Sequence, residues 1–488
     1  MKQFKRSQPF AFPTAFLKSQ LIKSQTRSTS KMSRWSPKFS SNSLGSLDRE
    51  RVQMRQAVPV ISSYLLSKEA RERGTYSRPI PVVCKDLLVQ NALYTGNLEA
   101  VKEIFSRGFP NDVIIQPQGE AMRWVTNGKV RGRWSLTYEQ ELTTPLHITA
   151  SRGFTECLRH LLLRGARVDL APGGNTALHE ACEECQPECA KLLLQYGANV
   201  SAMNEDGQMP LHVCTERKSL ECAKHLIAFG AVVNSQTLDE NDTPLHVAAR
   251  NGLPEHVDLY LRHGAMLNLQ NDDGQTALNA ACSQPQDRAS LERYTRVCHL
   301  LMDAGADVHI SDADKQTPLH MACKNANPDV VDMLLKKGAL VDQMDYVGNA
   351  PLHNILKVIA YKIDHEPERI VQALLNYGSI RVWPGALPKM LKYWSTSPRT
   401  IQALINTYDR LKITDAWVEA VPPELFQKHR EFFESLFALI NTPRSLQHLT
   451  RHRLRSFLKG RLHTVVPKLG LPTFLRNYLM LAFRDYVH

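Results

Sequence analysis

Two kinds of apolar segment alternate along residues 85–380. The first opens with Thr-Pro-Leu-His or a close variant and continues with small or apolar residues, as from Thr243 to Ala249. The second carries a run of leucines, as in Leu192–Leu194, and ends at a glycine. Proline is favoured in the first turn of a helix, and glycine just beyond its last turn. Each copy is therefore predicted to form two short helices followed by a polar turn, such as residues 204–208.

These paired segments recur with a period close to 33 residues. The fourth residue of each motif follows the previous one by 32, 33, 34, 33, 41 and 33 residues. The distance to the closing glycine is 18 residues in five copies and longer in the fifth and seventh, which predicts insertions around Ser283–Tyr294 and Val358–Pro367. The seven copies begin at Thr144, Thr176, Met209, Thr243, Thr276, Thr317 and Ala350.

A period of about 33 residues built on Thr-Pro-Leu-His resembles the ankyrin repeat. The resemblance implies an all-α solenoid over residues 85–380, in which helix pairs stack because one pair cannot bury its own apolar face. Residues 87–108 keep the two-helix pattern without the motif and are predicted to be a degenerate first unit. Residues 109–143 are then an insertion before the regular copies.

The amino-acid composition and the repeat pattern change after Ser379. Residues 381–440 contain many aromatic residues and prolines, with amphipathic stretches at Pro398–Tyr408 and Pro423–Ile440. Irregular helices in this linker are predicted to cover the apolar face that the last repeat leaves exposed. A basic amphipathic helix should follow, with Thr442 as its N-cap and Pro443 in its first turn.

That helix carries apolar residues at three- and four-residue spacing, from Leu446 through Leu454 to Phe457. The C-terminal helices are too small to form a core of their own, so we expect the leucines to dock on a partner protein. The alternative is that the leucines pack on the end of the array.

Residues 441–488 resemble a SOCS box, and the whole layout over about residues 85–488 is similar to the ankyrin repeat and SOCS box protein family, in particular its members ten, eighteen and four. The resemblance implies a small helical box that binds elongin B, elongin C and a type-five cullin. It assigns elongin contacts to Ser445, Leu446, Leu449, Thr450 and Leu454, and cullin contacts to Leu469, Leu471, Pro472, Leu475, Tyr478 and Leu479.

Two residues depart from the family pattern. Thr450 stands where the family usually has cysteine, and its hydroxyl needs a hydrogen-bond partner if another protein covers it. Gly470 replaces the first proline of a Leu-Pro-apolar-Pro run, which leaves this segment less rigid before binding.

The net charge of +12 is concentrated at the two ends of the chain. Residues 1–80 carry +12 and residues 441–488 carry +8, whereas residues 81–440 carry −8. The acidic middle argues against binding to nucleic acid, because it repels phosphate. Residues 1–80 are predicted to be a disordered basic tail, although their composition overlaps with that of mitochondrial targeting segments.

No apolar run is long enough to span a membrane, and no secretory signal pattern is present. The ten cysteines are therefore expected to be reduced. These features predict a protein of the cytoplasm, with the nucleus as a second compartment and mitochondrial import as the less favoured alternative.

Three cysteines, Cys182, Cys185 and Cys189, lie close together near His179 and invite a metal-site interpretation. The repeat pattern favours packing, because Cys182 occupies a small helix-packing position and no second cysteine pair completes a four-ligand site. No P-loop, Gly-x-Ser-x-Gly or His-Glu-x-x-His motif occurs. We therefore predict a non-catalytic protein with no cofactor and no metal.

The turns between copies are acidic, which predicts a target protein with a basic docking surface. The alternative is a local role, because aspartate is favoured in tight turns for bonds to its own backbone. The predicted target contacts are Glu205, Asp206, Asp239, Asp242, Asp273 and Asp314, with Glu240, Asp272 and Asp312 beside them.

These features together predict a substrate receptor of a cullin–RING ubiquitin ligase. The array holds the target, the box recruits the elongins and the cullin, and ubiquitin transfer follows from proximity, with proteasomal degradation as the expected outcome. Two alternatives stay open. One is an ankyrin scaffold or inhibitor outside any ligase, and the other is a metal-dependent enzyme or sensor built on the three cysteines.

Overall fold

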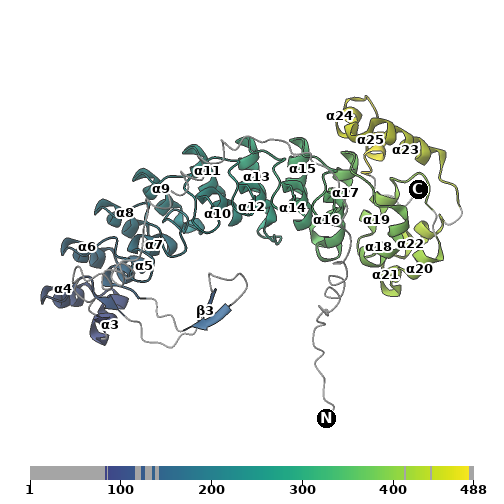
Figure 1. The fold of residues 1–488 in the computed structure, drawn as a ribbon. Coiled ribbons are helices and arrows are strands. Elements are labelled where there is room, and N and C mark those ends of the chain that lie inside the picture. Colours follow the sequence, from purple (N-terminus) through teal and green to yellow (C-terminus); the bar gives the residue numbers. More distant parts are fainter. Residues whose placement is uncertain are drawn as a thin grey trace, which may run out of the picture. The chain divides into compact units, whose positions relative to one another are not determined.

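The computed structural model describes residues 83–84, 86–115, 123–126, 134–137, 142–411, 414–439 and 442–482. Within these residues the chain is almost entirely helical, and the helices follow one another as a row of pairs (Figure 1). The predicted all-α class is confirmed. The predicted basic tail, residues 1–80, lies outside the described residues. No described helix is long and apolar enough to cross a membrane.

Successive helix pairs stack first helix on first helix and second on second, so that one apolar core runs from Cys84 to Leu436. A first unit, α3 (Leu87–Thr95) with α4 (Leu98–Ser106), occupies the region of the degenerate pattern. The regular pairs are α5 (Pro145–Ser151) with α6 (Thr155–Leu163), α7 (Ala177–Glu183) with α8 (Pro187–Gln195), α10 (Pro244–Arg250) with α11 (Pro254–Arg262), α12 (Ala277–Ser283) with α13 (Leu291–Asp303), α14 (Pro318–Asn325) with α15 (Pro328–Lys336), and α16 (Pro351–Val358) with α17 (Pro367–Asn376).

The third copy departs from the prediction of two helices. Its first segment forms turns and the 3-10 helix η1 (Arg217–Ser219), and only its second helix, α9 (Leu220–Ala228), is regular. Met209 has no hydroxyl with which to cap a helix, and the β-branched Val213 and Thr215 follow it. α16 forms after Ala350, which also lacks a hydroxyl, and α5 forms with Ile148 and Thr149, so the third copy differs in combining both features.

Short strands lie at the start of the array. β1 (Val83–Cys84) pairs in parallel with β2 (Ile114–Ile115), and β3 (Arg123–Thr126) pairs antiparallel to β4 (Trp134–Thr137). Ile115 also bridges to Thr143, just before α5. The described parts of the predicted insertion, residues 109–143, therefore pair with the segment just before α3 and also bring the two ends of the insertion together.

The two predicted insertions meet across the sixth copy. The insertion of the seventh copy forms η2 (Ile359–Tyr361) and η3 (Ile363–His365). Lys362 Nζ donates to the carbonyl of Gln286 in the fifth copy at 2.6 Å. Asn327 of the sixth copy donates to the Gln286 side-chain oxygen at 2.8 Å. The insertions thus tie together copies that are not neighbours in the stack.

The linker continues the stack instead of simply covering its end. After η4 (Pro384–Ala386), α18 (Leu387–Trp394) and α19 (Pro398–Ile405) form a further helix pair, and α19 packs on α17. Trp394 is buried, and its indole N–H donates to the carbonyl of Leu356 at 2.9 Å. The remaining linker helices are α20 (Asp415–Glu419), α21 (Pro423–Lys428) and α22 (Arg430–Phe437).

The histidine of the repeat motif links each copy to the next. Nδ1 of His179 lies 2.8 Å from the hydroxyl of Thr176 in its own motif, and Nε2 lies 3.1 Å from the carbonyl of Gln208 in the turn that leads into the following copy. His246 and His320 repeat both contacts. In the fifth copy Asn279 makes the same link, since its amide donates to the carbonyl of Ile310 at 3.2 Å. These side chains hold the stack together.

The buried histidines predict that acid destabilises the array. Burial lowers the pKa of His147 and His179 from 6.5 to about 4. The folded array keeps both neutral, so the unfolded chain takes up protons first as the pH falls below 6.5. We expect the free energy of unfolding to fall between pH 6.5 and 4, by about 1.4 kcal/mol per pKa unit for each histidine. Urea titrations at a series of pH values measure this.

His179→Asn introduces the residue that the fifth copy has at Asn279, which makes the same contact to a backbone carbonyl and has no titrating group. This substitution should therefore reduce the pH dependence of the unfolding free energy. His309→Gln is the matched control, because His309 is exposed and outside the motif. An array whose stability stays constant across this pH range would show that the motif histidines do not titrate as proposed.

Candidate functional site

The basic helix after the linker is α23 (Leu446–Leu458), and Ser445 is its N-cap. The Ser445 hydroxyl oxygen accepts a hydrogen bond from the backbone N–H of His448 at 3.2 Å. The predicted cap at Thr442 was wrong, because the Thr442 hydroxyl donates to the carbonyl of Ala438 instead. The chain continues through η5 (Lys459–Arg461), α24 (Leu462–Val465), η6 (Val466–Lys468) and α25 (Thr473–Leu479).

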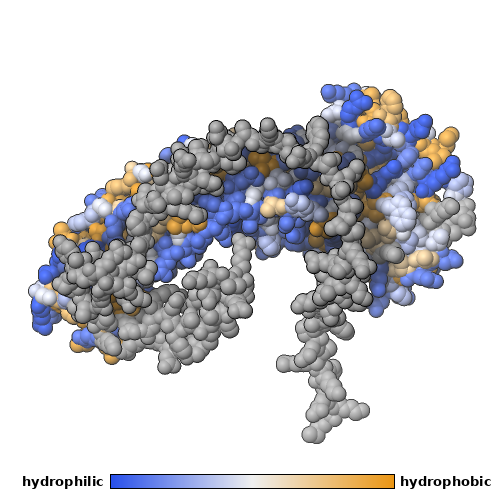
Figure 2. Space-filling model, in the orientation of Figure 1, coloured by the Kyte–Doolittle hydropathy of each residue, from blue (hydrophilic) through white to orange (hydrophobic). Residues whose placement is uncertain are grey.

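The apolar face of α23 points to solvent. Leu446 is 81% exposed and Phe457 is 76% exposed, and Leu449 and Leu454 between them are 38% and 43% exposed. Figure 2 shows apolar surface at this end of the chain. The alternative in which these leucines pack on the array is therefore wrong. All five residues assigned to the elongins, from Ser445 to Leu454, are exposed on α23.

The opposite face of α23 is polar and buried. His448, Arg451 and Arg455 follow one another at helical spacing and are 0%, 1% and 8% exposed. Burial lowers the pKa of His448 to about 4 and the pKa of Arg455 to about 9. The helix is therefore attached to the rest of the chain by its polar side, which leaves its leucines free.

Thr450, the departure from the family pattern, has an internal partner for its hydroxyl. The hydroxyl donates to the carbonyl of Leu446 at 2.8 Å, one turn earlier in the same helix. A partner protein can therefore cover Thr450 without leaving this donor unsatisfied.

The segment assigned to the cullin is partly open to solvent. Leu469 is 43% exposed, and Pro472 is also exposed. Leu471 and Leu475 are half-buried. A Cβ atom built on Gly470 meets nothing within 4 Å, so the absence of the family's proline leaves open space at this position.

Leu479 has a different role from the one assigned to it. Its side chain is buried in a small apolar cluster with Leu462 and Val466. Tyr478 beside it is half-buried, with the guanidinium of Arg451 4.3 Å from its ring centre. The prediction that Leu479 contacts the cullin directly disagrees with this burial, because the side chain completes the core of the box.

The acidic turns are joined into a continuous row. The backbone N–H of Leu238 donates to the carbonyl of Gly207 at 3.2 Å, that of Asp272 to Glu240 at 3.0 Å, and that of Ala313 to Asp273 at 2.8 Å. Five of the predicted target contacts are exposed along this row, which we call the acidic ridge: Glu205, Asp206, Asp239, Asp273 and Asp314.

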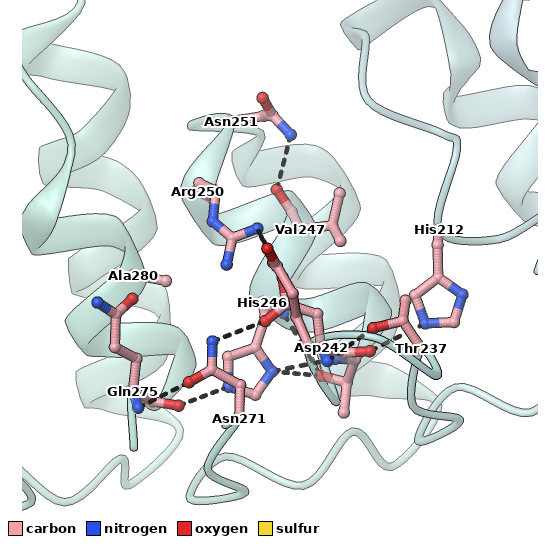
Figure 3. A network of polar contacts seen from close by, with 12 residues as sticks. His212, Thr237, Asp242, His246, Val247, Arg250, Asn251, Asn271, Gln275 and Ala280 are labelled. Carbon is pink, nitrogen blue, oxygen red and sulfur yellow. Dashed lines mark hydrogen bonds and ion pairs between the residues drawn. The ribbon is translucent and has the colours of Figure 1, made fainter. Parts of the chain in front are cut away.

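Asp242 does not belong to the acidic ridge, and its assignment to the target was wrong. It is 3% exposed, and its carboxylate lies 2.6 Å from Arg250 Nη1 (Figure 3). The other carboxylate oxygen accepts from the Asn271 amide at 2.9 Å. Asp312 likewise serves its own turn, accepting from the backbone N–H of Gln316 at 2.7 Å. The alternative of a bond to the backbone of its own turn therefore holds for Asp312, whereas Asp242 bonds the side chains of Arg250 and of Asn271 in the next turn.

The three neighbouring cysteines do not face a common point where a metal could bind. Cys182 lies in the core beside Cys214 and Cys222, and these thiols with its burial raise its pKa. Cys189 lies 3.6 Å from the Thr155 hydroxyl, while Cys185 approaches Glu216. Burial raises the pKa of Cys185 to about 11, whereas a metal ligand must be a thiolate. No cluster of three or more candidate ligands occurs among the described residues.

The fold and the C-terminal helices define an ankyrin-repeat protein with a SOCS box. Residues 88–204, 211–291 and 287–382 match the family of Ankyrin repeats (3 copies), and residues 442–480 match the SOCS box. The chain is 39% identical to Ankyrin repeat and SOCS box protein 16 of Mus musculus, over 81% of this chain and 85% of that protein.

Two human relatives are similar over comparable lengths. Identity is 45% to Ankyrin repeat and SOCS box protein 10, over 81% of this chain and 87% of that protein. Identity is 42% to Ankyrin repeat and SOCS box protein 18, over 80% of this chain and 85% of that protein. The chain belongs to the ankyrin repeat and SOCS box protein family, as predicted. This combination is that of a substrate-recognition adaptor of a cullin–RING ligase, for which the SOCS box implies elongin and cullin partners in general terms.

Two exposed aromatic residues were missing from the predicted site. Phe457 extends the leucine stripe of α23 by one turn, and Phe474, on α25, is 69% exposed next to Pro472. The helical spacing from Leu446 predicts Phe457 as part of this face, but the family resemblance assigns it no contact. Phe474 could not be distinguished by spacing alone from its half-buried neighbour Leu475.

Asp242 and Asp239 belong to the same turn but should respond differently to substitution. Asp242→Ala leaves Arg250 and Asn271 without their acceptor, and we expect a loss of about 1–3 kcal/mol of unfolding free energy. Asp239→Ala is the matched control and should change stability by less than about 0.5 kcal/mol, because Asp239 is exposed. Urea unfolding followed by circular dichroism measures both. Equal effects would contradict the structural role of Asp242.

Proposed function

We propose that this chain recruits target proteins to a ubiquitin ligase assembled from elongin B, elongin C and a type-five cullin, and that the targets are then degraded by the proteasome. The observation that carries the proposal is the outward apolar face of α23. In this proposal the chain supplies no nucleophile, because holding a target near the ubiquitin-loaded enzyme raises the effective concentration of the target lysine.

Elongin binding is supported by the shape of the exposed stripe. Leu446, Leu449 and Leu454 occupy one side of a helix, as anchors do when a helix lies in a groove. Burying a leucine on a partner stabilises a complex by ~1.5–3 kcal/mol. The polar contacts on the other side of α23 do not need to break when a partner covers these residues.

Cullin binding is supported by the exposed residues that follow. Leu469 and Pro472 remain in the proposal, together with Phe474. Leu471, Leu475 and Tyr478, which are half-buried, contribute through their exposed edges. Leu479 is left out, since it supports α25 from within the box.

Target binding is proposed for the acidic ridge. The carboxylates of Asp239 and Asp273 make no ion pair with a described residue, and they lie in consecutive turns. Leu238, which precedes Asp239, is 67% exposed. A target with a basic surface that also carries an apolar residue fits this combination of charge and apolar contact.

The double substitution Leu446→Ala/Leu454→Ala tests the ligase assignment. We expect it to abolish co-purification with elongin B and elongin C, because it removes two of the leucine side chains that are proposed to fill a groove on the elongins. Co-expression followed by pull-down measures this, with thermal unfolding as the check on folding.

Leu340→Ala is the matched control, since Leu340 is 59% exposed but lies within the array. It should leave elongin binding unchanged. If the wild-type chain fails to bind the elongins, the ligase proposal fails and the ankyrin scaffold becomes the better account.

The acidic ridge predicts salt-sensitive target binding. For a protein captured by the wild-type chain, Asp239→Asn/Asp273→Asn should lower the affinity about tenfold and flatten its dependence on salt. Titrations at about 50 and 300 mM salt measure this by calorimetry. An affinity that is independent of salt in the wild type would remove the ridge from the target site.

A further inference from the structure

The polar face of α23 contacts the carboxyl ends of helices. Arg455 Nη1 donates to the carbonyl of Leu479, the last residue of α25, at 2.6 Å and to the Asn376 side-chain oxygen at 2.8 Å. Its Nη2 donates to the carbonyl of Leu375 in the last turn of α17 at 3.2 Å. One guanidinium thus joins α23 to the last repeat and to the last helix of the box.

A second contact of the same kind joins α23 to the linker. Arg451 Nη2 donates to the carbonyl of Asn406, the C-cap of α19, at 3.3 Å and to His448 Nδ1 at 2.8 Å. Arginine cannot accept a hydrogen bond, so His448 Nδ1 is unprotonated and Nε2 carries the hydrogen. His448 Nε2 therefore donates to the carbonyl of Tyr408 at 2.8 Å.

The last repeat also contacts the end of the box with its own side chains. The amides of Gln372 and Asn376, both on α17, donate to the carbonyl of Met480 at 2.8 and 2.9 Å. Met480 is the C-cap of α25. The ring of Tyr377 stacks on His463 of the box, with centroids 3.6 Å apart and planes 11° from parallel.

Close backbone packing completes the junction. A Cβ atom on Gly378 would lie 2.8 Å from the Cα of Gly460, and one on Gly460 would lie 2.6 Å from the carbonyl oxygen of Tyr377. Only glycines allow the repeat and the box to approach so closely. The last repeat and the box therefore fit together at these two glycines in one relative position.

Physical chemistry explains why arginines occupy this position. The last carbonyls of a helix have no partner within it and carry partial negative charge, so a cation there is favourable. Arg455 is nonetheless 8% exposed and has no carboxylate within ion-pair distance among the described residues. Removing a charge from water in this way is costly, and the hydrogen bonds offset the cost only in one geometry.

We propose that Arg455 is a positioning residue that holds the SOCS box at a fixed angle to the ankyrin array before any elongin binds. The direction from target site to ligase is then a property of this chain alone. This inference deepens the proposed function, because a fixed angle matters for transfer of ubiquitin to a bound target.

The test measures how narrowly the box is held relative to the array, through a distance between the two in the full-length chain. Spin labels are attached through ketone-bearing amino acids at Lys336 and Lys468, both exposed, because the ten cysteines of the chain exclude thiol labelling. Pulsed electron resonance then gives the distribution of distances between array and box. The wild type should give one narrow distribution, with or without elongin B–elongin C.

Arg455→Met should broaden this distribution of distances. Arg455→Lys should give a distribution of intermediate width, since lysine keeps the positive charge but lacks the two guanidinium nitrogens that bind separate carbonyls. Arg453→Met is the matched control, because Arg453 lies on the same helix and is exposed. Gln372→Ala/Asn376→Ala removes three hydrogen bonds of the junction from the array side, two to Met480 and one from Arg455, and leaves the sequence of the box intact, so it gives an answer even if Arg455→Met unfolds the box.

A broad distribution in the wild type, or one in a folded Arg455→Met variant that is as narrow as that of the wild type, would overturn the proposal. If Arg455→Met does not fold, an unchanged narrow distribution in Gln372→Ala/Asn376→Ala would do so. Elongin binding is measured on the same samples and should be equal in wild type and junction variants. Loss of elongin binding in the wild type would count against the proposed function and not against the junction, so the two failures are distinguishable.

Discussion

The carbonyl groups at the ends of α17, α19 and α25 are the constraint on which the C-terminal half of this protein depends. These groups cannot be satisfied within their own helices. Arg455 and Arg451 bind them from one face of α23. Because that face is occupied by the array, the leucines on the other face remain available. Two of the positive charges of the box, those of Arg451 and Arg455, are thus buried inside the protein.

The same principle operates along the array on a smaller scale. Five motif histidines bind a backbone carbonyl in the turn that leads into the following copy, and Asn279 does so where histidine is absent: His147, His179, His212, His246 and His320. Side chains that satisfy leftover backbone groups thus fix the orientation of each copy relative to the next. Contacts of the same kind continue from the last repeat into the box, where Arg455 binds the backbone carbonyls of Leu375 and Leu479.

The repeated motif made most of the fold predictable. Threonine, proline, leucine and histidine at fixed positions each have a local structural reason, and seven copies left little ambiguity about the array. The pair α18–α19 was read as irregular because it lacks the motif, although it packs as another repeat. Tertiary contacts that no local pattern records decided that case.

The candidate site was predictable on its exposed side only. The leucine spacing from Leu446 predicted the face that points to solvent. Burial of His448, Arg451 and Arg455 could not be predicted, because charged residues at helical spacing usually indicate a solvated face. Asp239 and Asp242 show the same limit, since two aspartates of one turn differ in role only through the position of Arg250.

The most direct measurement of the central claim is an electron cryomicroscopy structure of the full chain bound to elongin B, elongin C and the type-five cullin. The account predicts that Leu446 and Leu454 are buried against an elongin while Arg455 still bridges Leu375 and Leu479. A complex in which α23 has turned its arginines outward, or in which the elongins bind elsewhere, would contradict it.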